Sequence, residues 1–198
     1  MKRMVMVLMA LAFAVSMVQA ASWTVYEDYT AYKAVKEAAS KASDEGNTTV
    51  SVAKYKEAAA LAAKSATKEI QAWQLNSAAY ELIKAFKKTT DYSAKIEQLS
   101  GMTASKEKFA TQKEIAANLE ANIAPLTEAK AILEEAKALE GGEGPAEKIA
   151  SNLDFISWVN QFLEDTKNPV EKKVEAAVNA GKEAVKDAEK PVEATKAK

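Results

Sequence analysis

The side chains that could perform chemistry in this chain are few in kind. The sequence contains no histidine and no cysteine, and Arg3 is its only arginine. Without histidine a protein lacks the usual near-neutral acid–base group and the commonest metal ligand. Without cysteine it lacks a thiol nucleophile, disulfides and zinc–thiolate sites. Only Asp, Glu, Lys, Tyr, Ser and Thr remain for catalysis, so we expect a protein that is not an enzyme and that uses no cofactor and no metal.

Two groups of acidic residues have types that could bind a metal ion. Glu128, Glu134 and Glu135 lie in a stretch interleaved with lysine, a pattern typical of surface charges on a helix. The segment 44–47, Asp-Glu-Gly-Asn, lacks the spaced ligands and the terminal glutamate of a calcium loop. We therefore predict surface charges in the first case and a turn in the second.

An aromatic run near the N-terminus offers stacking surfaces instead of reactive groups. Its members recur at helical spacing: Trp23, Tyr26, Tyr29 and Tyr32. Packing in a core is the first interpretation of such a run. The alternative is an exposed platform that stacks on a sugar or on a partner protein.

The first 20 residues have the pattern of a secretory signal peptide. Lys2 and Arg3 precede an apolar run over residues 4–15, and the small residues Val18 and Ala20 stand where a signal peptidase requires them. The run is shorter than the roughly 20 residues of a membrane-spanning helix, which argues against the alternative of an uncleaved anchor. We expect cleavage after Ala20, a periplasmic or secreted protein, and no integral membrane segment after cleavage.

The charge of the chain is nearly balanced. There are 27 Lys and Arg residues against 28 Asp and Glu residues, for a net charge of −1. Loss of Lys2 and Arg3 with the signal peptide leaves 25 basic against 28 acidic residues, or about −3. Because the lysines are dispersed among acids, we expect no nucleic-acid partner.

The elements that must position any site are predicted to be helices, and the most apolar of them covers residues 71–88. Large and small apolar residues recur there at steps of three and four: Leu75, Ala79, Leu82 and Phe86. Only a narrow polar strip remains: Gln74, Ser77, Glu81, Lys84 and Lys88. A helix so apolar around its circumference needs neighbours on more than one side, so we predict the middle helix of an all-helical layer.

Similar periodicity and turn residues predict the other helices. Their ranges are 24–43, 52–66, 92–99, one opening at residue 103 or 105, 125–139, and 146–165. Ser51 and Thr67 are the expected N-caps of the second helix and of the central one. The glycine-rich segment 141–145 is the clearest break. The helical domain is thus expected over residues 21–166, followed by a Lys/Ala/Glu/Val-rich tail over residues 167–198 that is solvated and partly helical or disordered.

The spacing of several residues resembles tetratricopeptide-repeat (TPR) helical hairpins. Trp73 and Tyr80 are spaced as in the first helix of that family, with Ser77 where glycine is usual and Asn76 where leucine is preferred. The second-helix pattern of small and large residues is matched by Ala129, Leu133 and Ala136, and in part by residues 55–58 with Ala62. The resemblance covers residues 24–139.

This resemblance implies an all-α fold of antiparallel hairpins stacked as a short TPR-like solenoid, with the helix after the break as a cap. It also implies a concave face that binds peptides or proteins and that would include Gln71, Gln74 and Glu81. The alternative for these three residues is the solvated side of a helix. A closed helical bundle is the alternative to the solenoid.

Two functions are therefore expected from the sequence. The first is an exported, non-enzymatic protein-interaction module that binds a protein or peptide partner in the periplasm or cell envelope. The alternative is a structural, envelope-associated helical-bundle protein whose tail makes peripheral contact with lipid or cell wall.

Overall fold

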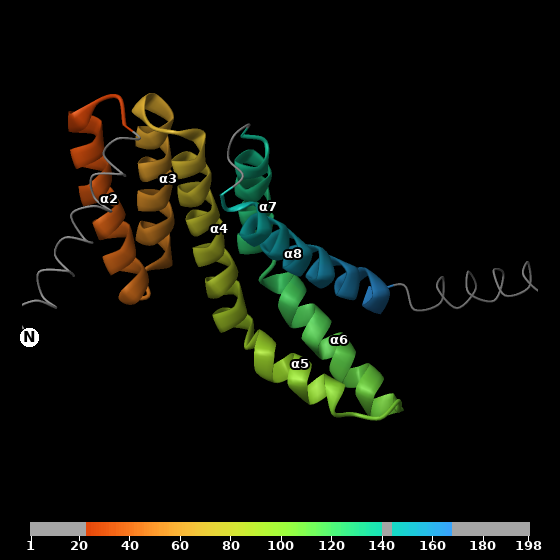
Figure 1. Ribbon diagram of the computed structural model, residues 1–198. Helices are drawn as coiled ribbons and strands as arrows, with labels where there is room; N and C mark the ends of the chain where they lie inside the picture. The colour runs from red at the N-terminus through yellow and green to blue at the C-terminus, as the bar shows by residue number, and fades with distance from the viewer. Residues whose placement is uncertain (1–22, 140–143, 168–198) are drawn as a thin grey trace, which may run out of the picture.

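The computed structural model describes residues 23–139 and 144–167. These residues form seven helices and no strand, which confirms the predicted all-α class. The helices are α2 (Tyr26–Asp44), α3 (Thr48–Ser65), α4 (Lys68–Thr90), α5 (Tyr92–Ser100), α6 (Lys106–Ala121), α7 (Ala124–Lys137) and α8 (Ala146–Lys167) (Figure 1). The predicted signal peptide, most of the predicted break, and the tail beyond Lys167 lie outside the described residues.

Helix α4 lies in the middle of a helical layer, as its apolar pattern predicts. Helices α2, α3 and α4 run antiparallel side by side, and α7 packs on the other side of α4 (Figure 1). The side chains of Ile83 and Phe86 are fully buried, and Ala78 and Ala79 have no exposed surface. Burial of each large side chain stabilises the fold by roughly 1.5–3 kcal/mol. The small alanines allow the neighbouring helices to approach α4 closely.

A second, smaller core holds most of the aromatic run. Trp23, Tyr29 and Tyr32 are buried against Ala58 and Ala62 of α3, and the ring centroids of Trp23 and Tyr32 are 4.8 Å apart. Core packing is therefore confirmed for three of the four aromatic residues. The fourth, at the first position of α2, is 73% exposed (Tyr26).

The helix starts follow the predicted capping chemistry with one exception. Thr67 accepts a hydrogen bond from a backbone N–H in the first turn of α4, as expected. The N-cap of α3 is Asn47, so the prediction of Ser51 at that position is wrong. Gly46, at φ 75°, turns the chain just before Asn47, and the helix begins one turn earlier than predicted. The hydroxyl of Ser51 is buried and donates to the carbonyl oxygen of Ala39 at 3.1 Å.

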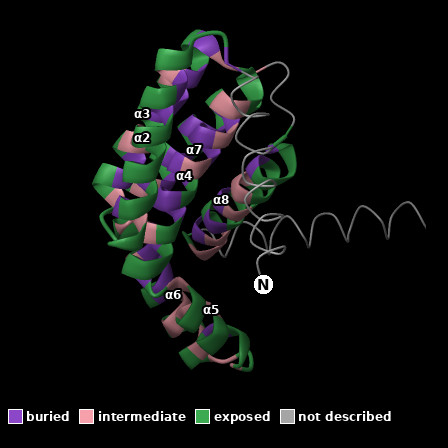
Figure 2. Ribbon diagram, turned by 60° about the vertical axis from the view of Figure 1, so that its left-hand side comes forward, coloured by how far each residue is buried: buried purple, intermediate pink, exposed green. Residues whose placement is uncertain are grey.

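Helices α5 and α6 extend beyond the layer as an arm (Figures 1 and 2). The chain turns from α4 into α5 at Asp91, whose backbone lies in the left-handed region at φ 50° and ψ 40°. Leu99 is the buried residue of α5, whereas Phe109 near the start of α6 is 56% exposed. The second half of α6 rejoins the main core through Ile115, Ala116 and Leu119, which are buried.

Helix α8 packs against α6 and α7 and also contacts α4. It runs obliquely beside these helices (Figure 1), and it buries one apolar stripe: Ile149, Ile156, Val159 and Leu163. Aromatic contacts tie it to the α4–α5 joint, where the ring of Tyr92 lies 5.2 Å from that of Phe155 and 5.8 Å from that of Trp158. The predicted apolar helix after the break is thus present and is covered by earlier helices.

Candidate functional site

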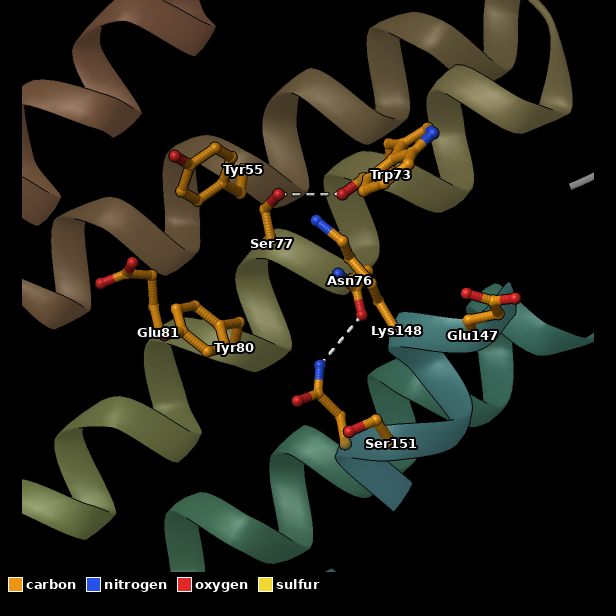
Figure 3. A pocket seen from close by; sticks show the side chains of 10 residues that line it. Tyr55, Trp73, Asn76, Ser77, Tyr80, Glu81, Glu147, Lys148 and Ser151 are labelled. Carbon is orange, nitrogen blue, oxygen red and sulfur yellow. Dashed lines mark hydrogen bonds between the residues drawn. The ribbon is translucent and has the colours of Figure 1, made fainter. Parts of the chain in front are cut away.

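A groove lies between α3, α4 and α8 in the described part of the chain. Its volume is about 700 Å3, and we call it the main groove (Figure 3). Its walls combine aromatic rings, amides, hydroxyls and charged groups: Tyr55, Trp73, Asn76, Ser77, Tyr80, Glu81, Glu147, Lys148, Ser151 and Asn152.

One face of α4 supplies half of these residues. Positions 76, 77, 80 and 81 lie three, four, seven and eight residues after Trp73, which places their side chains on a single face of a helix. The hydroxyl of Ser77 donates to the carbonyl oxygen of Trp73 at 2.9 Å and so stays within its own helix. Tyr80 is 52% exposed, so its ring is available to a ligand.

Helix α8 forms the opposite wall. The amide nitrogen of Asn152 donates to the amide oxygen of Asn76 at 3.1 Å and links the two walls (Figure 3). The ammonium group of Lys148 lies 5.1 Å from the centre of the Trp73 ring, a distance suited to a cation–π interaction. These contacts hold α8 at a defined position relative to α4.

A smaller cavity of about 320 Å3, here the side pocket, lies between α2, α3 and α4. Its lining residues are Tyr32, Lys36, Tyr55, Ile70, Trp73, Gln74 and Ser77. Three of them, Tyr55, Trp73 and Ser77, also line the main groove. The two concavities therefore adjoin along these shared side chains.

The carboxylate of Glu81 is the buried charge of the main groove. The residue is only 7% exposed. Its Oε1 accepts a hydrogen bond of 2.8 Å from the hydroxyl of Ser43, and its Oε2 lies 3.6 Å from the ammonium nitrogen of Lys84. A buried carboxylate is costly unless it is paired and hydrogen-bonded, and these two contacts offset part of that cost.

Two tyrosines at this site hold their protons more tightly than usual. Burial, followed by the negative charges of Glu81 and Asp44, raises the pKa of Tyr55. Burial raises the pKa of Tyr32 to about 12, with smaller contributions from Tyr29 and Tyr55. Both phenols therefore stay neutral near neutral pH and can act as hydrogen-bonding groups.

The three residues expected on a binding face are found in different places. Glu81 lines the main groove and Gln74 lines the side pocket. Gln71 lines a third cavity of about 420 Å3 on the α7 side of α4, so the three do not share one site. The alternative of a solvated side is wrong for Gln74 and Glu81, which are 5% and 7% exposed, because α2 and α3 cover that strip of α4.

Sequence reasoning missed most of the groove. Trp73 and Tyr80 could have been found, because two aromatic residues seven positions apart share a helical face. Tyr55, Lys148 and Asn152 could not, since only the packing of α3 and α8 against α4 brings them there.

The acidic groups weighed as metal ligands behave as predicted. The carboxylate of Glu128 lies 2.7 Å from the ammonium nitrogen of Lys56, and that of Glu134 lies 3.7 Å from the ammonium nitrogen of Lys130. All four side chains are substantially exposed. The segment around Gly46 forms the predicted turn. Within residues 23–139 and 144–167, no three acidic side chains come together in a way that could hold a metal ion.

None of the helices in the described ranges combines the length and apolar character needed to cross a membrane. Comparison of the chain with protein-family models, with curated proteins and with solved structures found no match. What can be inferred about function therefore depends on the main groove and its neighbourhood.

Proposed function

We propose that this chain is a non-enzymatic protein-interaction module that holds a peptide segment of a partner protein in the main groove. The observation that carries the proposal is the groove itself, an open concavity of about 700 Å3 with aromatic and amide walls. Rings can bury the apolar side chains of a peptide, while amides and hydroxyls can pair with its backbone. Binding and not turnover is favoured because the chain has neither histidine nor cysteine.

We further propose that the layer is built from TPR-like hairpins, α2 with α3 and α4 with α7. Ala129 and Leu133, two of the residues that carry the second-helix pattern, are fully buried in the core that α4 shares with α7. Asn76, where the family prefers leucine, is accounted for by its hydrogen bond to Asn152. Helices α5 and α6 would then be an insertion between the two helices of the second hairpin.

The module is proposed to act after export, in the periplasm or cell envelope or outside the cell. The support is the basic start, the apolar run over residues 4–15 and the small residues before the expected cleavage after Ala20.

A photo-crosslinking experiment tests this function. A photoreactive phenylalanine analogue is placed at position 80 of the full chain, in the wall of the main groove. We expect it to capture a defined partner protein in the exported compartment. The same analogue at position 109, which is an exposed aromatic position on α6, is the matched control and should capture none.

Selection from a display library of random short peptides tests the groove directly. The wild-type protein and the Phe109→Ala variant should enrich the same peptides. The double variant Trp73→Ala, Tyr80→Ala should not, because it removes two aromatic surfaces of the groove. Equal enrichment by all three proteins, or none by the wild type, would contradict the proposed function.

A further inference from the structure

We propose that the peptide held in the main groove continues along α8, where it carries a large apolar residue that packs on Trp158 and a neighbouring acidic residue that pairs with Lys87. This inference rests on the proposed peptide-binding function and specifies the chemistry of the partner segment. It is carried by an exposed aromatic surface of α8 in line with the groove, and by an exposed ammonium group beside that surface.

Three aromatic residues of α8 form a row that we call the aromatic face: Phe155, Trp158 and Phe162. The rings of Trp158 and Phe162 are stacked, with an interplanar angle of 15° and centroids 5.5 Å apart. Phe155 and Phe162 are partly buried, whereas Trp158 is 44% exposed. A ligand can therefore reach the indole ring of Trp158 from solvent and bury apolar surface against it.

The aromatic face continues the α8 wall of the main groove. Ser151 lines the groove, and positions 155, 158 and 162 follow it by four, seven and eleven residues, which places them on the same side of the helix. The buried stripe of α8, which includes Ile156, lies on another side. A peptide that leaves the groove along α8 therefore meets Trp158.

Helix α4 supplies the facing wall beyond Tyr80. Lys84 and Lys87 follow Tyr80 by four and seven positions and share its side of α4. The ammonium nitrogen of Lys84 lies 3.6 Å from a carboxylate oxygen of Glu81. That of Lys87 lies 4.0 Å from the centre of the Phe155 ring, and no carboxylate of the described residues lies within 4.0 Å of it. The exposed Lys87 is therefore available to an acidic group of a ligand.

The two walls give the same spacing between the groove and the aromatic face. Tyr80 and Lys87 are seven positions apart on α4, and Ser151 and Trp158 are seven positions apart on α8, which corresponds to about 10 Å along each helix axis. An extended peptide covers that distance in about three residues, and its successive side chains point to opposite sides. The apolar residue on Trp158 is therefore expected about three positions from the residue beside Tyr80, and its acidic neighbour faces Lys87.

The peptides enriched from the display library by the wild-type protein test this inference. We expect them to share a large apolar residue directly next to an acidic one. A synthetic peptide of that sequence should bind the Trp158→Ala variant about tenfold more weakly than the wild type, because a large aromatic contact is lost. The control Phe109→Ala, which removes an exposed ring on α6, should leave the dissociation constant unchanged.

The acidic residue is tested through Lys87. Lys87→Gln should weaken binding about threefold, the effect expected for an exposed ion pair. Lys33→Gln is the matched control and should have no effect, because Lys33 is also exposed with its ammonium group over an aromatic ring, that of Tyr29, but lies on α2.

A change on the peptide side keeps the test independent of any effect of the substitutions on folding. Replacing the acidic residue by its amide should weaken binding to the wild type about threefold and should have little further effect on the Lys87→Gln variant. Enriched peptides without the acidic–apolar pair, or equal affinity of either variant and the wild type for the peptide, would overturn the inference while the proposed function stands.

Two other occupants of the aromatic face would give different results. If Trp158→Ala converted a dimer into a monomer and kept its peptide affinity, a second copy of the chain would cover the face. If the affinity depended on Trp158 only after removal of residues 168–198, the chain's own tail would cover it. Either result would overturn the inference, and enrichment of no peptide at all would overturn both the inference and the proposed function.

Discussion

Gln74 and Tyr32 show how a polar pair is accommodated between packed helices. The amide of Gln74 on α4 donates to the phenol of Tyr32 on α2 at 3.0 Å, and both residues are almost completely buried. The phenol is also part of the small aromatic core with Trp23. A single hydrogen bond therefore joins the edge of that core to the floor of the side pocket.

Tyr32→Phe should lower the stability of the fold. The substitution leaves the buried amide nitrogen of Gln74 without its acceptor, and an unsatisfied buried donor costs about 1–3 kcal/mol. The free energy of unfolding, measured with chemical denaturant, should fall by that amount. Tyr26→Phe at the exposed start of α2 is the control, and a change of more than about 0.5 kcal/mol there would contradict this explanation.

Alkaline pH should destabilise the protein through the same phenol. Burial raises the pKa of Tyr32 to about 12 in the folded chain, whereas an unfolded tyrosine has a pKa of about 10. The folded state therefore binds the proton more tightly, and stability that is fully present below pH ~10 is lost as the pH rises towards ~12. The loss should be on the order of 1–3 kcal/mol.

Denaturant curves recorded across this alkaline range measure the effect. Tyr32→Phe should show a shallower decline relative to its own stability at neutral pH. Some decline should remain, because burial also raises the pKa of Tyr55 and of Tyr92. An identical slope in wild type and variant would show that Tyr32 does not carry the effect.

At the scale of elements, α4 both builds the core and lines the groove. One side of the helix buries Ile83 and Phe86, and another presents Trp73 and Tyr80 to the main groove. The chain passes from α4 to α5 through a single residue. Asp91 ends α4 and begins α5 in a left-handed conformation.

Substitutions of Asp91 should separate backbone strain from side-chain effects. The left-handed conformation costs a non-glycine residue about 1–2 kcal/mol, and Asp91 makes no side-chain capping hydrogen bond to α5. Asp91→Gly should therefore raise the free energy of unfolding by about 0.5–1 kcal/mol. Asp91→Val should lower it by about 1–2 kcal/mol, because β-branched residues fit this region poorly. Thermal and denaturant unfolding measure both changes, and a stabilising valine would refute the strain argument.

At the scale of the whole molecule, the main groove joins parts of the chain that lie far apart in the sequence. Its lining runs from Tyr55 to Asn152, and that of the side pocket begins at Tyr32. The consecutive helices α3 and α4 meet the distant helix α8 around the main groove.

Removal of residues 168–198 should leave peptide binding unchanged under the proposed function. The truncated protein should bind the peptides enriched by the full chain with the same dissociation constant, measured by fluorescence anisotropy. It should also remain in the same exported compartment. Loss of envelope retention with intact peptide binding would favour a role of the tail at lipid or cell wall, and loss of binding would contradict the proposed role of the groove.

Local features of the chain could be predicted from the sequence because their causes are local. The apolar period of α4, the cap at Thr67, the turn at Gly46 and the position of Pro125 in the first turn of α7 each depend on residues within one or two turns. The all-α class follows from these features. The cap of α3 was misplaced because Asn47 and Ser51 are both suitable capping residues, and the choice between them lies in the turn geometry.

Tertiary structure alone decided which polar residues are buried and where the groove lies. Periodicity placed Gln74 and Glu81 on a narrow polar strip, expected to be a binding face or else a solvated side. Side chains from α2 reach both residues, and both are buried. The hydrogen bond between Asn76 and Asn152 joins residues 76 positions apart, a separation that no local pattern encodes. Burial depends on what packs against a helix, and for α4 the covering helices come from both ends of the described chain.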